Sequence, residues 1–180
     1  FINNVSHPAD RFRPSQDAFL SWYAKATTEK HLGEASVWYL FSTQAAEEIK
    51  AFNPDARIII MLRNPVDMLY SLHSHFLYEL NESIEDFTEA LDAGQRRLAG
   101  QDIPSTAYIP DCLAYRKVVQ YAEQVERYVE VFGPERVKVI LFDDFKNDVP
   151  GVYRDTLRFI GARDDFEPDF VPVNEKRRLK

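Results

Sequence analysis

The sequence has little cysteine, no surplus of basic residues and no long apolar run. Cys112 is the only cysteine in 180 residues, which excludes an internal disulfide and a zinc site built on several cysteines, so we expect no metal site. Such scarcity suits a reducing compartment, and we expect a cytoplasmic protein. Lys and Arg number 22 against 29 Asp and Glu, and the net charge of −7 argues against a general nucleic-acid partner. No run reaches the roughly 18 apolar residues that a membrane-spanning segment requires.

Two short, continuously apolar segments predict β-strands, at residues 57–62 and 137–142. Continuous rather than alternating apolar character is typical of parallel strands that are covered on both faces. Helical patterns lie between and around them, over residues 16–26, 43–52, 65–79, 115–132 and 151–160. We therefore expect a single α/β domain over residues 1–180, with a central parallel sheet flanked by helices. Ligands of such sheets bind beyond the carboxyl ends of the strands.

The stretch between residues 80 and 115 gives weaker signals. Ser83 is a candidate cap for another helix, with Asp86 reaching back to the cap amide. Residues 94–111 are irregular and are interpreted as a surface excursion. Within them, Arg96 and Arg97 are expected to lie on a solvated helix face; the alternative is that they contact an anionic acceptor.

The turn after Leu62 predicts an anion site. Asn64 is suited to cap the following helix, and Pro65 to its first position, where no amide donor is needed. Asp67 can reach back to the cap amide, and Ser71 lies one turn further on the same side. Arg63, the helix N-terminus and the Ser71 hydroxyl are then within reach of one anion. The alternative is a capped helix in which Arg63 merely pairs with Asp67.

The spacing of Arg63 and Ser71 resembles the segment of sulfotransferases that binds the 3′-phosphate of the sulfonate donor. The resemblance runs in the same order from about residue 32 to residue 160, and is closest to the bacterial and heparan-sulfate branches. It includes the Gly-Glu-Ala-Ser segment at 33–36, the pattern of Tyr, Gln, Arg and Tyr in the helix at 121–132, and the strand and acidic turn at 139–145.

This resemblance implies a three-layer, P-loop-like fold, the donor 3′-phosphoadenosine 5′-phosphosulfate (PAPS) and the product adenosine 3′,5′-bisphosphate (PAP). It implies that Arg63 and Ser71 contact the 3′-phosphate, and that Glu34 is the base that deprotonates the acceptor. Burial would raise the pKa of Glu34 toward a value that suits that role, but the sequence does not show burial, and the alternative is an exposed loop carboxylate. His73 and His75 are the rival bases; they are expected on different faces of their helix, and His75, four residues past Ser71, is the one placed to line the cleft. Lys176 and Arg177 match a basic segment that covers the cofactor in the family, or else form a solvated tail.

The family's N-terminal phosphate-binding loop, with its Lys, is missing. None of the six glycines lies in that context. We expect that the chain is truncated at its N-terminus; otherwise it is a degenerate relative without activity. The function expected is sulfonate transfer to a hydroxyl or amine, on a small-molecule or glycan acceptor. The alternatives are a non-catalytic nucleotide-binding or interaction domain and a P-loop kinase, against which the absent Walker loop argues. The sequence gives no signal for the oligomeric state.

Overall fold

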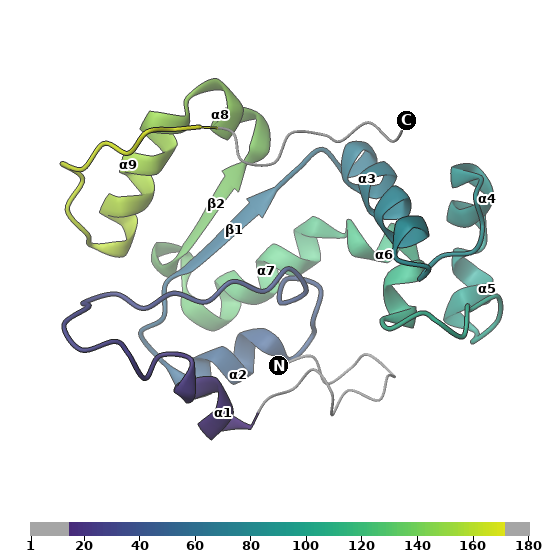
Figure 1. Cartoon of the computed structure of the whole chain (residues 1–180), viewed down its shortest axis with the longest axis horizontal. Coiled ribbons are helices and arrows are strands. Elements are labelled where there is room, and N and C mark those ends of the chain that lie inside the picture. Colours follow the sequence, from purple (N-terminus) through teal and green to yellow (C-terminus); the bar gives the residue numbers. More distant parts are fainter. Residues whose placement is uncertain (1–14, 172–180) are drawn as a thin grey trace.

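Two parallel strands form the centre of the fold in the computed structural model, which describes residues 15–171. Strand β1 (Ile58–Leu62) pairs with β2 (Val137–Leu141) along their full length, with Ile58 opposite Val137 and Leu62 opposite Leu141. Figure 1 shows both strands pointing the same way, with helices around them. The predicted α/β class with a parallel sheet is confirmed.

The helices are α1 (Gln16–Ser21), α2 (Ala45–Phe52), α3 (Pro65–Tyr78), α4 (Phe87–Asp92), α5 (Gly94–Leu98), α6 (Tyr115–Val118), α7 (Tyr121–Phe132), α8 (Phe142–Asn147) and α9 (Val149–Ile160), with 3₁₀ turns η2 (Pro110–Leu113) and η3 (Pro134–Arg136). The predicted helices appear in the expected order; most are shorter than predicted, α9 begins two residues earlier, and α8 is a further helix where an acidic turn was expected. No helix within residues 15–171 is long and apolar enough to cross a membrane.

One hydrophobic core lies between the sheet and helices α2 and α7. Its buried members are Ala46, Ile60, Tyr128 and Phe132. Helices α8 and α9 contact β2 as well. The strands are nevertheless not covered on both faces by the described residues, which corrects the prediction: Ile59, Met61, Val139 and Leu141 are 43%, 50%, 41% and 51% exposed. A sheet of two strands is all edge, so its outer side chains lack the neighbours that a wider parallel sheet supplies.

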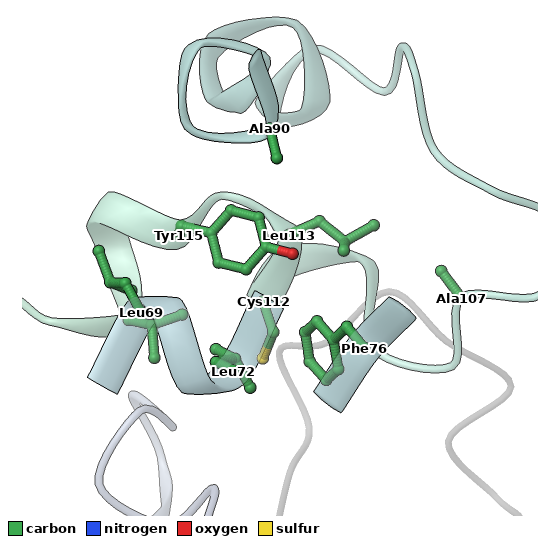
Figure 2. Packing of buried hydrophobic residues seen from close by; sticks show 9 residues of the cluster. Leu69, Leu72, Phe76, Ala90, Ala107, Cys112, Leu113 and Tyr115 are labelled. Atoms are coloured by element: carbon green, nitrogen blue, oxygen red, sulfur yellow. The ribbon is translucent and has the colours of Figure 1, made fainter. Parts of the chain in front are cut away.

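A second core joins α3 to the segment between α4 and α6. Figure 2 shows Leu69, Leu72 and Phe76 of α3 facing Cys112 and Tyr115. Cys112 and Leu113 have no exposed surface. The predicted surface excursion at 94–111 is wrong at Ala107, which is buried in this core.

Arg97 is fully buried, where the sequence predicted a solvated face. Its guanidinium forms two bonds to the Glu82 carboxylate, Nη1 to Oε2 at 2.8 Å and Nη2 to Oε1 at 2.6 Å, and both side chains are 0% exposed. Tyr115 donates its hydroxyl to the same carboxylate at 2.8 Å. Arg96 does lie outside, paired with Asp102. Of these two adjacent arginines, Arg97 is therefore part of the core and Arg96 faces solvent.

The expected helix over 115–132 is broken at residues 119–120. Gln124 compensates from within α7, because its Nε2 donates to the carbonyls of Lys117 and Val118 at 3.1 and 3.3 Å. The expected start at Ser83 is also wrong. Asp86 is the cap of α4 and accepts from the Glu89 amide at 2.9 Å.

Candidate functional site

The residues that follow β1 and β2 lie at the same edge of the sheet, because the two strands are parallel and their carboxyl ends are aligned. Leu62 and Leu141 are paired, so Arg63 and Phe142 leave the sheet side by side. The Arg63 guanidinium carbon lies 5.7 Å from the centre of the Phe142 ring. This edge is where an α/β sheet offers a ligand site, and it carries the arginine that the sequence singled out.

Helix α3 begins as its sequence predicts. The Asn64 side chain accepts from the amides of Val66 and Asp67 at 3.0 and 3.4 Å, and Pro65 occupies the first helical position. These bonds use the free amides of the first turn. An anion at this end therefore gains from the helix dipole and from side-chain donors rather than from those amides.

Asp67 does not act as the predicted reciprocal cap. Its Oδ2 lies 4.0 Å from Nη2 of Arg63, at the outer limit of an ion pair, and its side chain is 65% exposed. Exposed pairs of this kind contribute little to stability. The alternative in which Arg63 pairs with Asp67 is thus present, but the pair is weak. It leaves most hydrogen-bond donors of Arg63 without a partner among residues 15–171.

Ser71 lies two turns into α3, about 9 Å along the axis from Pro65 by the helical rise. It is exposed, and its hydroxyl makes no hydrogen bond to any residue in the range 15–171. Arg63, just before α3, and Ser71, on α3, therefore offer a cation and a hydroxyl, and among the described residues Arg63 has no carboxylate partner other than Asp67. A phosphate group can accept hydrogen bonds from both.

Tyr121 is the first residue of α7, and the charge of Arg63 acts on it. Burial raises the pKa of the Tyr121 hydroxyl, and the positive charge of Arg63 opposes that shift. Tyr121 belongs to the sequence pattern at 121–132, but that pattern does not predict that a helix begins there, because the break at residues 119–120 gives no signal in the sequence.

Glu34 lies in an irregular segment and is exposed, as the alternative of an exposed loop carboxylate predicted. Two tyrosines contact the segment that contains Glu34. The Tyr39 side chain hydrogen-bonds the Glu34 carboxylate, and burial together with that bond raises the pKa of Tyr39 above its usual range. Tyr23 donates its hydroxyl to the carbonyl of Gly33 at 3.2 Å. The carboxylate is thus held in place by neighbours while staying open to solvent and to an acceptor.

The segment that follows Glu34 is fixed between α7 and α3. Tyr128 donates its hydroxyl to the carbonyl of Tyr39, and Arg127 donates to that of Ser42, each at 2.8 Å. Trp38 packs against Phe76 of α3 with ring centres 6.2 Å apart. Residues far apart in the sequence therefore set the position of the candidate base.

Replacing Tyr128 with Phe removes one of these bonds without changing the packed volume. We expect the free energy of unfolding to fall by about 1 kcal/mol, the usual net value of such a bond plus an unpaired carbonyl. Thermal unfolding followed by circular dichroism measures this. Tyr121→Phe is the matched control, since the Tyr121 hydroxyl donates to no described residue, and an equal loss in both variants would contradict the role of the Tyr128 bond.

The two histidines of α3 take different places. His73 is buried against Phe87 and Tyr115, and its Nε2 lies 2.8 Å from the carbonyl of Ile84, so it is part of the core. His75 is exposed, with Nε2 3.3 Å from Oε1 of Glu79. It lies about 15 Å along α3 from Pro65 by the helical rise, a full turn beyond Ser71. Lys176 and Arg177 lie outside the described residues.

No group of three or more His, Cys, Asp or Glu side chains within residues 15–171 is arranged to hold a metal ion. Asp143 and Asp144, at the carboxyl end of β2, lie in the first turn of α8, where acidic side chains complement the helix dipole.

Comparisons with known proteins agree on one family. The model of the Sulfotransferase family matches residues 2–167. Carbohydrate sulfotransferase 15 of Mus musculus and that of Homo sapiens are each 28% identical over 137 residues, which are 72% of this chain but only 23% of theirs. The crystal structure of a sulfotransferase from Alicyclobacillus acidocaldarius is 35% identical, with a TM-score of 0.78 over 99% of this chain and 69% of that one.

Proposed function

Because the chain belongs to the sulfotransferase family, we propose that it transfers a sulfonate group from PAPS to a hydroxyl or amine of a carbohydrate acceptor. The observation that supports this most is Arg63 at the sheet edge, beside the N-terminus of α3 and with only one weak carboxylate partner among the described residues. The carbohydrate acceptor rests on relatives that are named carbohydrate sulfotransferases.

The residues at the edge of the sheet fit the donor's 3′-phosphate. The Arg63 side chain is 31% exposed, so part of it is accessible to a ligand. It can form two parallel bonds to phosphate oxygens, and the Ser71 hydroxyl can donate a third. The α3 dipole adds a favourable field. PAPS, when bound, supplies the activated sulfonate; these residues bind and orient it.

In the proposed transfer step, the acceptor oxygen or nitrogen forms a bond to the sulfur atom while the bond from sulfur to the bridging phosphate oxygen breaks. The electron pair of that bond leaves with PAP. The acceptor's proton passes to the carboxylate of Glu34, which its exposed position leaves open to the acceptor. Tyr39 orients Glu34 through the hydrogen bond described above.

A non-catalytic nucleotide-binding domain is the second candidate. All six glycines lie within the described residues, and none is in the turns from β1 to α3 or from β2 to α8. The 180 residues thus hold no glycine-rich loop at the sheet edge to cradle the transferred group. This candidate predicts nucleotide binding without turnover.

Titration calorimetry with PAP and with AMP tests the proposed site. PAP should bind more tightly than AMP, because only PAP carries the 3′-phosphate. Arg63→Ala should weaken PAP binding by about 1.5–3 kcal/mol, the scale of hydrogen bonds to a charged group, and leave AMP binding unchanged.

Arg57→Ala is the matched control, since Arg57 precedes the opposite end of β1 and faces Phe159. Its affinity for PAP should equal that of the unmodified chain. If PAP binds no more tightly than AMP, or if Arg63→Ala changes nothing, the assignment of the donor site is wrong.

A further inference from the structure

A cavity of about 380 Å³ lies between α4, α5 and α6, on the far side of the α6–α7 break from Arg63. Its wall combines three kinds of side chain: apolar, carboxamide and cationic. They are Leu91, Leu98, Gln95, Gln120, Arg116 and Lys117. Helices of the second core carry this wall, and the site described above uses none of these residues.

The charge of the cavity is opposite to that of the chain. Arg116 and Lys117 line it together with a single acid, Asp92, although the whole chain carries a net charge of −7. Nη2 of Arg116 lies 3.6 Å from Oδ1 of Asp92, and both side chains are more than two-thirds exposed, so the pair is weak. Lys117 forms no ion pair with a carboxylate of residues 15–171. A local cationic wall in an acidic protein favours an anionic ligand.

The uncharged side chains of the wall indicate which other groups the ligand carries. The side-chain amides of Gln95 and Gln120 make no hydrogen bonds to other described residues, so their donors and acceptors are available. Leu91 and Leu98 supply apolar surface beside them. A sugar ring presents hydroxyl groups at its edge and C–H groups on its face, and this wall complements both.

The cavity ends at the break between α6 and α7. Gln120 lines the cavity, and the next residue, Tyr121, begins α7, which packs against β1. One helix thus connects the cavity to the sheet whose edge carries Arg63. We propose that the cavity binds an acidic sugar unit of the acceptor, with Arg116 and Lys117 receiving its anionic group; this rests on the proposed function.

The test uses two hexasaccharides of equal length. One alternates glucuronate and N-acetylglucosamine, and the other contains N-acetylglucosamine alone. The acidic probe should bind at least about tenfold more tightly, and Arg116→Ala/Lys117→Ala should remove that advantage. The matched control is Arg96→Ala, which removes a neighbouring exposed cation that does not line the cavity and should leave binding unchanged.

Titration of PAP in the same samples separates the two proposals. Intact PAP binding without a preference for the acidic hexasaccharide overturns the cavity assignment alone, and the reverse result overturns the donor site alone. An equal loss with Arg96→Ala also overturns the assignment, because the attraction would then be general. Amide resonances of Gln95 and Gln120 in the unmodified chain should shift with the acidic probe; unchanged resonances contradict the proposal even if the double variant fails to fold.

Discussion

Glu34→Gln is expected to lower turnover of the full-length protein by about 10²–10⁴-fold while nucleotide affinity stays the same. This is the usual contribution of a positioned general base. The substitution keeps the size of the side chain and its capacity to accept the hydrogen bond from Tyr39. It removes only the basic oxygen that takes the acceptor's proton.

The expected loss is specific to kcat, because Glu34 lies in a segment separate from Arg63 and Ser71. That segment is held by the bonds from Tyr128 and Arg127 to the carbonyls of Tyr39 and Ser42. Tyr39→Phe should therefore lower kcat less than Glu34→Gln, since it loosens the carboxylate without removing it. Rapid quench of radiolabelled sulfonate transfer measures kcat directly.

The substitution His75→Gln tests whether His75, rather than Glu34, is the base. His75 pairs with Glu79 well down α3, and we expect its replacement to leave turnover within about threefold, since an exposed residue away from the reacting atoms affects the barrier little. Full activity in Glu34→Gln together with a large loss in His75→Gln would transfer the role of base to His75.

Local chemistry explains why the sheet edge could be predicted. Asn64 and Pro65 begin α3 through bonds within three residues, and apolar runs mark both strands. The same reasoning is wrong for Asp67, whose orientation depends on Arg63. It gives no answer for Glu34, whose exposure depends on how Tyr23 and Tyr39 pack. Neighbours that come from elsewhere in the chain decide such features, and periodicity carries no signal for them.

Arg97 illustrates the same limit more strongly. Its partner Glu82 is 15 residues away, and the carbonyl of Leu113 that its Nη1 also reaches at 3.2 Å is 16 residues away in the other direction. Two adjacent arginines in a polar stretch are typical of a solvated face. Only the packing of α5 against η2 separates a buried Arg97 from an exposed Arg96.

The second large effect is expected for the buried ion pair of Arg97 and Glu82. Arg97→Met should lower the free energy of unfolding by about 3–5 kcal/mol, because it leaves the Glu82 carboxylate buried without its counter-charge. Glu82→Gln should lower the free energy of unfolding by a similar amount, because it leaves the Arg97 guanidinium buried without its counter-charge. Arg96→Met is the matched control: that arginine is exposed and paired with Asp102, and its loss should cost less than about 1 kcal/mol.

The pH dependence separates a charged pair from simple packing. Burial works to raise the pKa of Glu82, but hydrogen bonds from Arg97, the Ile84 amide and Tyr115 outweigh it, and the pKa lies below its usual value. A carboxylate with a lowered pKa stabilises the fold fully above its unfolded value of about 4.3, and this stabilisation is lost as the pH falls through the folded pKa. Urea unfolding at pH 7 and at pH 3 should therefore show the gap between the unmodified chain and Glu82→Gln narrowing at low pH. A gap of equal size at both pH values would mean that Glu82 acts through packing and not through its charge.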